Sequence, residues 1–104
     1  MIRLGQHARL KPGYIDKYKR LHREVWPEVL ATIKKCNMQN YSIYIIGTEL
    51  FAYFEYVGTN FDADMERMAA DPITQNWWKH TKPCFEKHDQ EIYYVDMEEI
   101  FHLD

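Results

Sequence analysis

The period of the hydrophobic pattern changes near the start of the chain, and this change restricts the folds open to it. Residues 2–10 alternate between apolar and polar side chains, which predicts a strand with one buried face. After "KPGY", the apolar residues from Tyr14 to Ile33 recur every three or four positions, as they do on one face of an amphipathic helix. The chain therefore begins with a strand and a helix of about residues 13–35, whose apolar faces can cover each other.

The middle of the chain returns to the pattern of strands. "NYSIYII" (40–46) and "ELFAYFEYV" (49–57) are rich in β-branched and aromatic residues. A short turn at Gly47 and Thr48 separates them, so the two stretches predict a hairpin.

A second helical stretch and a C-terminal strand complete the element order. Asn60 is its predicted N-cap, and the helix restarts with Asp71 as cap and Pro72 at its first position. Pro83 ends it, and "EIYYVDMEEIFHLD" predicts one long or two short strands. The order βαββαβ indicates an α+β fold, a ferredoxin-like sandwich with two helices on one face of an antiparallel sheet.

Composition limits the class of protein. With 104 residues, 46% of them hydrophobic, the chain suits a single domain over 1–104. The net charge is −3 and the thirteen Lys and Arg residues are dispersed, so no nucleic-acid partner is expected. No apolar run approaches the roughly 18 residues of a membrane span and the N-terminus has no secretory h-region, so we expect no membrane partner and a cytoplasmic location.

The sequence motifs do not encode a local metal or cofactor site. The five histidines form no HxxxH or HExxH pair, although a site assembled in space from distant ligands stays open. Asp62, Asp64 and Glu66 are expected to be solvated acids in the first turns of a helix, since negative charge is favoured there. Cys36 and Cys84 are isolated, and free thiols are expected.

The first helix carries a histidine on its apolar face and a proline in its middle. Tyr18, His22 and Trp26 are four residues apart, so they form one row expected to face the sheet. Pro27 lacks a backbone N–H and disfavours helical geometry at Trp26, which predicts a break around 23–26. From composition alone, a hydrogen-bonded core histidine is the favoured interpretation of His22, and an acid/base role is the alternative.

Two aromatic pairs leave alternatives open. Trp77 and Trp78 are about 100° apart on a helix, so both cannot point to the core. One of them either covers an edge or interface or forms an aromatic platform for a ligand such as a sugar. Tyr41 and Tyr44 are expected on opposite faces of their strand, so only one of them can share a cavity with His22.

Over the whole chain, "YKRLHREVWPE", "NYSIY", "WWK" and the terminal "EEIFHLD" resemble the L-rhamnose mutarotase family in order and position. The resemblance implies a dimeric α+β barrel without metal or organic cofactor, in which a homodimer interconverts the anomers of L-rhamnose in the cytoplasm. It also implies roles for five residues, with His22 as proton donor and a sugar held by Tyr18, Tyr41, Trp77 and Trp78.

The reaction fits these residue types. Mutarotation opens and recloses a cyclic hemiacetal, so it needs positioned acid and base groups and no redox cofactor. Histidine titrates near neutral pH and can serve in either role. With the resemblance included, the catalytic interpretation of His22 becomes the favoured one. A cofactor-independent monooxygenase on the same scaffold and a non-catalytic sugar-binding module are the alternatives.

Two further expectations concern the surroundings of the site. The connection over 79–97 departs from the family pattern, because it is charged and aromatic here. It could close as a lid over the sugar, which makes L-fucose or another 6-deoxy sugar a competitor of L-rhamnose. The face of the sheet without helices, rich in Tyr and Phe, is expected to need cover from a second subunit.

Overall fold

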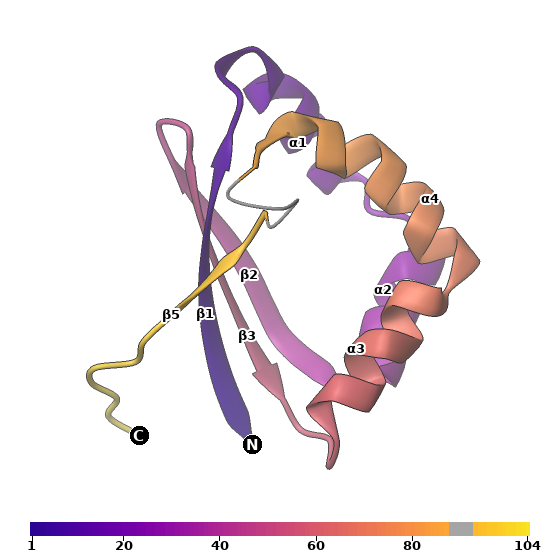
Figure 1. Cartoon of the computed structure of the whole chain (residues 1–104), viewed down its shortest axis with the longest axis vertical. Helices are drawn as coiled ribbons and strands as arrows, with labels where there is room; N and C mark the ends of the chain where they lie inside the picture. The colour runs from indigo at the N-terminus through magenta and orange to yellow at the C-terminus, as the bar shows by residue number, and fades with distance from the viewer. Residues whose placement is uncertain (88–92) are drawn as a thin grey trace.

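A curved antiparallel sheet forms one layer of the molecule, and helices cover one of its faces (Figure 1). The computed structural model describes residues 1–87 and 93–104. Within these residues the strands are β1 (Ile2–Leu10), β2 (Met38–Ile46), β3 (Glu49–Tyr56), β4 (Phe85–Glu86) and β5 (Val95–Met97). The helices are α1 (Ile15–Arg23), α2 (Pro27–Lys35), α3 (Phe61–Ala70) and α4 (Pro72–Thr81), with 3-10 turns η1 (Pro12–Tyr14) and η2 (Lys82–Cys84).

The strand order is β2-β3-β1-β4. β5 also pairs with β1, at Gly5–His7, whereas β4 pairs at Arg9 and Leu10. All of these pairings are antiparallel. With β3 and β1 at the centre, this is the strand order of the predicted ferredoxin-like α+β sandwich. The predicted fold class is therefore confirmed.

The C-terminal part differs from its prediction. The expected strand or strands over "EIYYVDMEEIFHLD" reduce to the short β5, and residues 98–104 form no strand. Part of that stretch, residues 91–92, and part of the predicted lid lie outside the described residues. A short strand that was not predicted, β4, pairs Phe85 with Leu10 at the edge of β1. A two-residue strand cannot be predicted from periodicity, because about four residues are needed to recognise alternation.

The predicted break in the first helix is confirmed. α1 ends at Arg23 and α2 begins at Pro27. Trp26 has extended backbone angles, φ −59° and ψ 134°, as expected for a residue before proline. Pro27 then occupies the first turn of α2, where its missing N–H costs nothing.

The caps of the second helical stretch are also confirmed. The Asn60 side chain accepts a hydrogen bond from the Ala63 backbone N–H at 3.1 Å. Asp71 accepts one from the Thr74 N–H at 2.9 Å, and Pro72 starts α4. In the acidic run, Asp64 accepts hydrogen bonds from Tyr56 and Asn37, so it ties α3 to the sheet.

A bulge in β2 decides which side chains face the helices. The pairing of β2 with β3 shifts between Gln39 and Ser42, and Asn40 has a positive φ of 49°. Because the bulge adds a residue, Tyr41 turns inward and its ring stacks on Phe54 with centroids 5.4 Å apart. Simple alternation from the buried Met38 would have placed Tyr41 on the outer face.

The core lies between the sheet and the helices. Its two clusters centre on Leu10 and Leu50 under α1 and on Phe54 under α2 and α3. Cys36 and Cys84 are buried free thiols, as predicted. In the part of the chain that the structure describes, no helix is long and apolar enough to cross a membrane.

Candidate active site

Tyr18 and His22 form the centre of the site on one face of α1. They are one helical turn apart, so their rings meet, with centroids 4.2 Å apart and planes at 28°. Tyr18 is 5% exposed, and its ring packs nearly perpendicular to that of Phe85, with centroids 5.3 Å apart. Phe85 belongs to β4, so the edge of the sheet also contacts Tyr18. The break after Arg23 ends the helix just beyond this pair.

The hydrogen bond of His22 fixes which of its nitrogens can accept a proton. Its Nδ1 lies 2.9 Å from the backbone oxygen of Tyr18. A carbonyl oxygen can only accept, so Nδ1 carries the proton and Nε2 of the neutral ring is unprotonated. Burial lowers the pKa of His22, and the bond to Tyr18 offsets part of this effect. The ring is therefore neutral near pH 7, with a basic nitrogen available.

The Tyr18 side chain interacts with two further tyrosines. The Tyr18 and Tyr94 hydroxyl oxygens are 3.1 Å apart and hydrogen-bonded. Tyr41 lies close enough to interact electrostatically with both of them. Desolvation by burial is the largest effect on all three and raises their pKa values. These phenols consequently stay protonated and can donate hydrogen bonds or a proton.

Two tryptophans form an aromatic wall behind His22. The edge of Trp77, from α4, meets His22 with ring centroids 5.6 Å apart. Trp26, from the break between α1 and α2, meets Trp77 at 5.3 Å. Trp26 was expected to face the sheet, but it packs on α4, because the extended backbone before Pro27 turns it out of the α1 row.

A cavity of about 320 Å³ opens beside the Tyr18–His22 pair. That volume lies at the lower end of small-molecule sites, so it suits a ligand of about the size of a monosaccharide. Its apolar walls come from β2 and β3 and its polar ones mainly from α1. The lining residues are Tyr18, Lys19, His22, Arg23, Ile43, Tyr44, Ile45 and Leu50.

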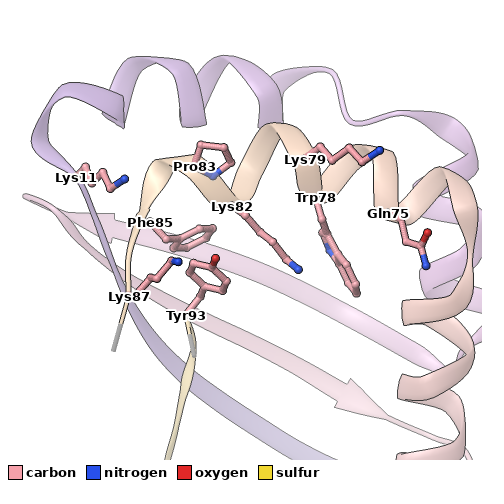
Figure 2. Close-up of a pocket in the computed structure, with 9 residues that line it drawn as sticks. All are labelled: Lys11, Gln75, Trp78, Lys79, Lys82, Pro83, Phe85, Lys87 and Tyr93. Carbon is pink, nitrogen blue, oxygen red and sulfur yellow. The ribbon is translucent and has the colours of Figure 1, made fainter. Parts of the chain in front are cut away.

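Trp78 lies outside this group. It lines a second cavity of about 480 Å³, drawn in Figure 2, between α4 and the residues that follow it, Lys82 to Lys87. The Lys82 ammonium group stands over its indole ring, 5.0 Å from the centroid. The residues described around this cavity include four lysines but no histidine or carboxylate, so it lacks the acid/base pair of the first cavity.

The predicted site residues are thus divided. The structure brings His22, Tyr18 and Trp77 into direct contact and places Tyr41 near Tyr18. It does not bring Trp78 to His22. Tyr44 borders the cavity with His22, although it pairs with Phe51 of the outer face and is 66% exposed. Tyr41 turns inward but is not among the residues that border this cavity. Tyr94 was not predicted, because it lies in the predicted C-terminal strand and nothing in that pattern signals a contact with a residue 76 positions earlier.

The site combines a neutral imidazole with protonated phenols, and Lys19 and Arg23 add positive charge at the cavity wall. It can take a proton at His22 Nε2 while a neighbouring phenol supplies one to another atom of the same ligand. Among the described residues, no group of three or more His, Cys, Asp or Glu side chains is arranged to hold a metal ion.

Comparisons with known proteins give consistent results. The family model described as L-rhamnose mutarotase matches residues 3–103. A curated L-rhamnose mutarotase from Lactiplantibacillus plantarum is 34% identical over 107 residues, covering 100% of both chains. The crystal structure of L-rhamnose mutarotase FA22100 from Formosa agariphila superposes with a TM-score of 0.81 at 24% identity, covering 100% of both chains. An antibiotic biosynthesis monooxygenase shares the fold with a TM-score of 0.61 at 14% identity, covering 96% of this chain and 99% of that one.

Proposed function

The chain belongs to the L-rhamnose mutarotase family, and on this premise we propose that His22 and Tyr18 interconvert the α and β anomers of L-rhamnose, as an isomerase. The observation that carries the roles is the hydrogen bond from His22 Nδ1 to the Tyr18 carbonyl. It leaves Nε2 free to accept a proton, beside a phenol that is held protonated.

The ring opens by two proton transfers. His22 Nε2 takes the proton of the anomeric hydroxyl group, and the electron pair of that O–H bond forms the carbonyl double bond. The bond from the anomeric carbon to the ring oxygen breaks, and its electron pair goes to the ring oxygen. Tyr18 supplies the proton that this oxygen needs, which leaves an open-chain aldehyde, an imidazolium and a phenolate.

Reclosure reverses these transfers on the other face of the carbonyl group. After rotation about the bond between the first two sugar carbons, the hydroxyl oxygen attacks the carbonyl carbon and returns its proton to Tyr18. His22 then donates its proton to the anomeric oxygen. The role of proton donor that the family resemblance implies for His22 belongs to this half of the reaction, and the enzyme ends in its starting state.

The remaining side chains are proposed to hold the sugar. Hydroxyl groups of L-rhamnose can bond to Tyr41 and Tyr18, and its methyl group can pack on the indole of Trp77. A sugar contact is also proposed for Trp78, although this residue lines the second cavity. Exchange rates measured with L-rhamnose, L-fucose and other 6-deoxy sugars would determine which sugar fits best.

The test is His22→Ala, with anomer exchange followed by NMR saturation transfer between the α and β signals of L-rhamnose. We expect the catalysed rate to fall about 10²- to 10⁴-fold, the usual contribution of a positioned acid/base group. The matched control is His80→Ala, an exposed histidine of α4, with circular dichroism on both variants.

Other outcomes would contradict the proposal. Unchanged exchange in His22→Ala would make His22 structural. A parent protein that binds L-rhamnose without accelerating exchange would be a sugar-binding module. Oxygen consumption with quinols and no exchange would instead indicate a monooxygenase.

The proposed enzyme is a homodimer, with two sheets packed face to face. The outer face of the sheet carries Phe51 and Tyr53 of β3, flanked by Val95 and Met97 of β5. Beyond β5, the tail carries Ile100, Phe101 and Leu103, which are 80–90% exposed. Apolar surface of this extent commonly marks an interface.

A cytoplasmic location is part of the proposal. Cys36 and Cys84 are both buried free thiols, as is usual where a reducing environment keeps cysteines unpaired. Fractionation of the source cells with an antibody against the chain would test it, and recovery outside the cytoplasm would contradict it.

A further inference from the structure

We propose that Tyr94 is a positioning residue for anomer exchange, which acts through Tyr18; this inference rests on the proposed function. None of the sequence motifs that carry the family resemblance includes Tyr94. Its hydroxyl oxygen lies 3.1 Å from that of Tyr18, although the two residues are 76 positions apart in the chain.

Phe85 holds the two tyrosines in this position. Its ring packs at a steep angle against both, with centroids 5.3 Å from Tyr18 and 5.4 Å from Tyr94. Since Phe85 is 5% exposed and belongs to the core cluster of Leu10 and Leu50, it gives both phenol rings a fixed support. The pair of hydroxyl groups is therefore built by the core.

The neighbouring Tyr93 shows that this contact is specific to one side chain. Tyr93 also packs on Phe85, at 5.5 Å, but it lines the second cavity, where the Lys82 ammonium group lies 6.0 Å from its ring (Figure 2). Adjacent tyrosines thus flank the same phenylalanine, and one of them reaches the Tyr18 hydroxyl group.

The chemistry of Tyr18 gives the Tyr94 hydroxyl group its role. When Tyr18 gives its proton to the ring oxygen of the sugar, its own oxygen becomes a phenolate in a desolvated place. Burial raises the pKa of Tyr18, so this charge is costly unless a donor faces it. Tyr94 is the hydroxyl group hydrogen-bonded to that oxygen. Either hydroxyl group can donate in the resting pair, where the bond to Tyr94 adds to the rise in the Tyr18 pKa. After the transfer only Tyr94 has a proton left to donate, so it then faces the phenolate as donor.

The test compares Tyr94→Phe with Tyr93→Phe, which remove one hydroxyl group each from adjacent residues packed on the same ring. Saturation transfer at several L-rhamnose concentrations gives kcat and KM. We expect Tyr94→Phe to lower kcat about 3- to 10-fold, as for the loss of one hydrogen bond, with KM within about twofold. Tyr93→Phe should match the parent.

A double-mutant cycle separates positioning from an effect on structure. In the Tyr18→Phe background no phenolate forms at residue 18, so adding Tyr94→Phe should change kcat by less than about twofold. A full additional loss in that background would show that Tyr94 acts independently of Tyr18, and equal kcat for the parent and Tyr94→Phe would show that it has no role. Either result overturns the inference.

Failure of the proposed function is distinguishable from failure of this inference. If the parent itself does not accelerate anomer exchange, the function is wrong. If the parent and Tyr93→Phe are active and Tyr94→Phe equals them, only the role of Tyr94 is wrong.

Discussion

At the scale of single residues, two properties of His22 together define its protonation state. Its burial lowers its pKa, and its bond to the Tyr18 backbone oxygen places the ring proton on Nδ1. Either alone would leave its state at neutral pH undetermined, because a buried ring can carry its proton on either nitrogen. Together they define a neutral base directed away from its own helix.

The lowered pKa of His22 predicts the pH dependence of exchange. Because protonation requires a pH below the ordinary histidine value of about 6.5, kcat/KM should be constant around neutral pH. It should fall only on the acidic side, as Nε2 becomes protonated. Saturation transfer from pH 4.5 to 8 would measure this. A loss of activity that begins above pH 7 would contradict a neutral, basic His22.

The same shift affects stability. The unfolded chain binds a proton at His22 more readily than the folded chain does, so stability rises with pH through the window below about 6.5. The contribution is present above that window and is lost as the pH falls through it. Urea unfolding at pH 5 and pH 7 should show a smaller pH difference for His22→Gln than for the parent. An unchanged difference would assign the dependence to other groups.

The two neighbouring tryptophans should respond differently to substitution. Trp77 contacts His22 and is 6% exposed, so Trp77→Phe should lower kcat/KM about 10-fold or more through loss of the wall behind the imidazole. Trp78→Phe should have a smaller effect, because Trp78 faces the second cavity. The ratio of the two kcat/KM values checks this. Equal losses would show that the second cavity also serves the sugar.

Residue spacing predicted part of this site and could not predict the rest. Tyr18 and His22 are one helical turn apart, so their contact follows from the geometry of a helix. The spacing of residues cannot show which of Trp77 and Trp78 faces the core, since that depends on how α4 is rotated about its own axis relative to the sheet. Tyr94 joins the site through a contact between parts of the chain that are 76 positions apart, which a local sequence pattern does not reveal.

At the scale of elements, two local irregularities direct side chains into the site. The break between α1 and α2 places Trp26 against Trp77, and the β2 bulge turns Tyr41 inward. The break was predictable, because the stereochemistry of Pro27 and of the residue before it is local. The bulge was not predictable, because a single inserted residue can be recognised only from the pairing of β2 with β3.

The bulge predicts that two substitutions of Asn40 differ in their effect on stability. Its φ of 49° is accessible to Asn and Gly but strained for a β-branched residue. Asn40→Val should therefore destabilise the fold by about 1–2 kcal/mol, whereas Asn40→Gly should cost less, measured by urea unfolding.

Exchange activity provides a second measurement on the same pair. If Asn40→Val relieves strain by shifting the register, Tyr41 moves to the outer face, and exchange should fall more than in Asn40→Gly. Equal stability and activity in the two variants would show that the bulge does not depend on the left-handed conformation.

At the scale of the whole molecule, the two faces of the sheet have different surroundings. Helices cover the inner face, while the tail after β5 runs away from them (Figure 1). The tail is fixed at its start by a two-point ion pair between Arg3 and Glu99, and apolar residues follow it. The sequence predicted an uncovered face, because the expected fold has helices on one face of the sheet and leaves Tyr and Phe on the other. It could not predict how the tail leaves the sheet, because its composition suits a strand.

A dimer formed through the outer face should be sensitive to charge at its centre. Phe51 pairs with His7 of β1 and Tyr44 of β2, so it lies on the central strand of that face. In a two-fold interface, Phe51→Glu brings in one buried charge from each subunit. The parent should sediment as a dimer at micromolar concentration, and Phe51→Glu should raise the dissociation constant at least about 30-fold, as expected for loss of a central contact.

The control for this experiment is Leu30→Glu, which places the same charge at an exposed position of α2, on the helical side. It should remain dimeric, and a monomeric parent would refute the face-to-face arrangement. Anomer exchange in the monomeric variant adds a further test. Tyr18, His22, Trp77 and Tyr94 all come from one chain, so a site complete in one subunit should keep its exchange rate per chain. A loss of exchange on dissociation, with circular dichroism unchanged, would mean that the partner completes the site.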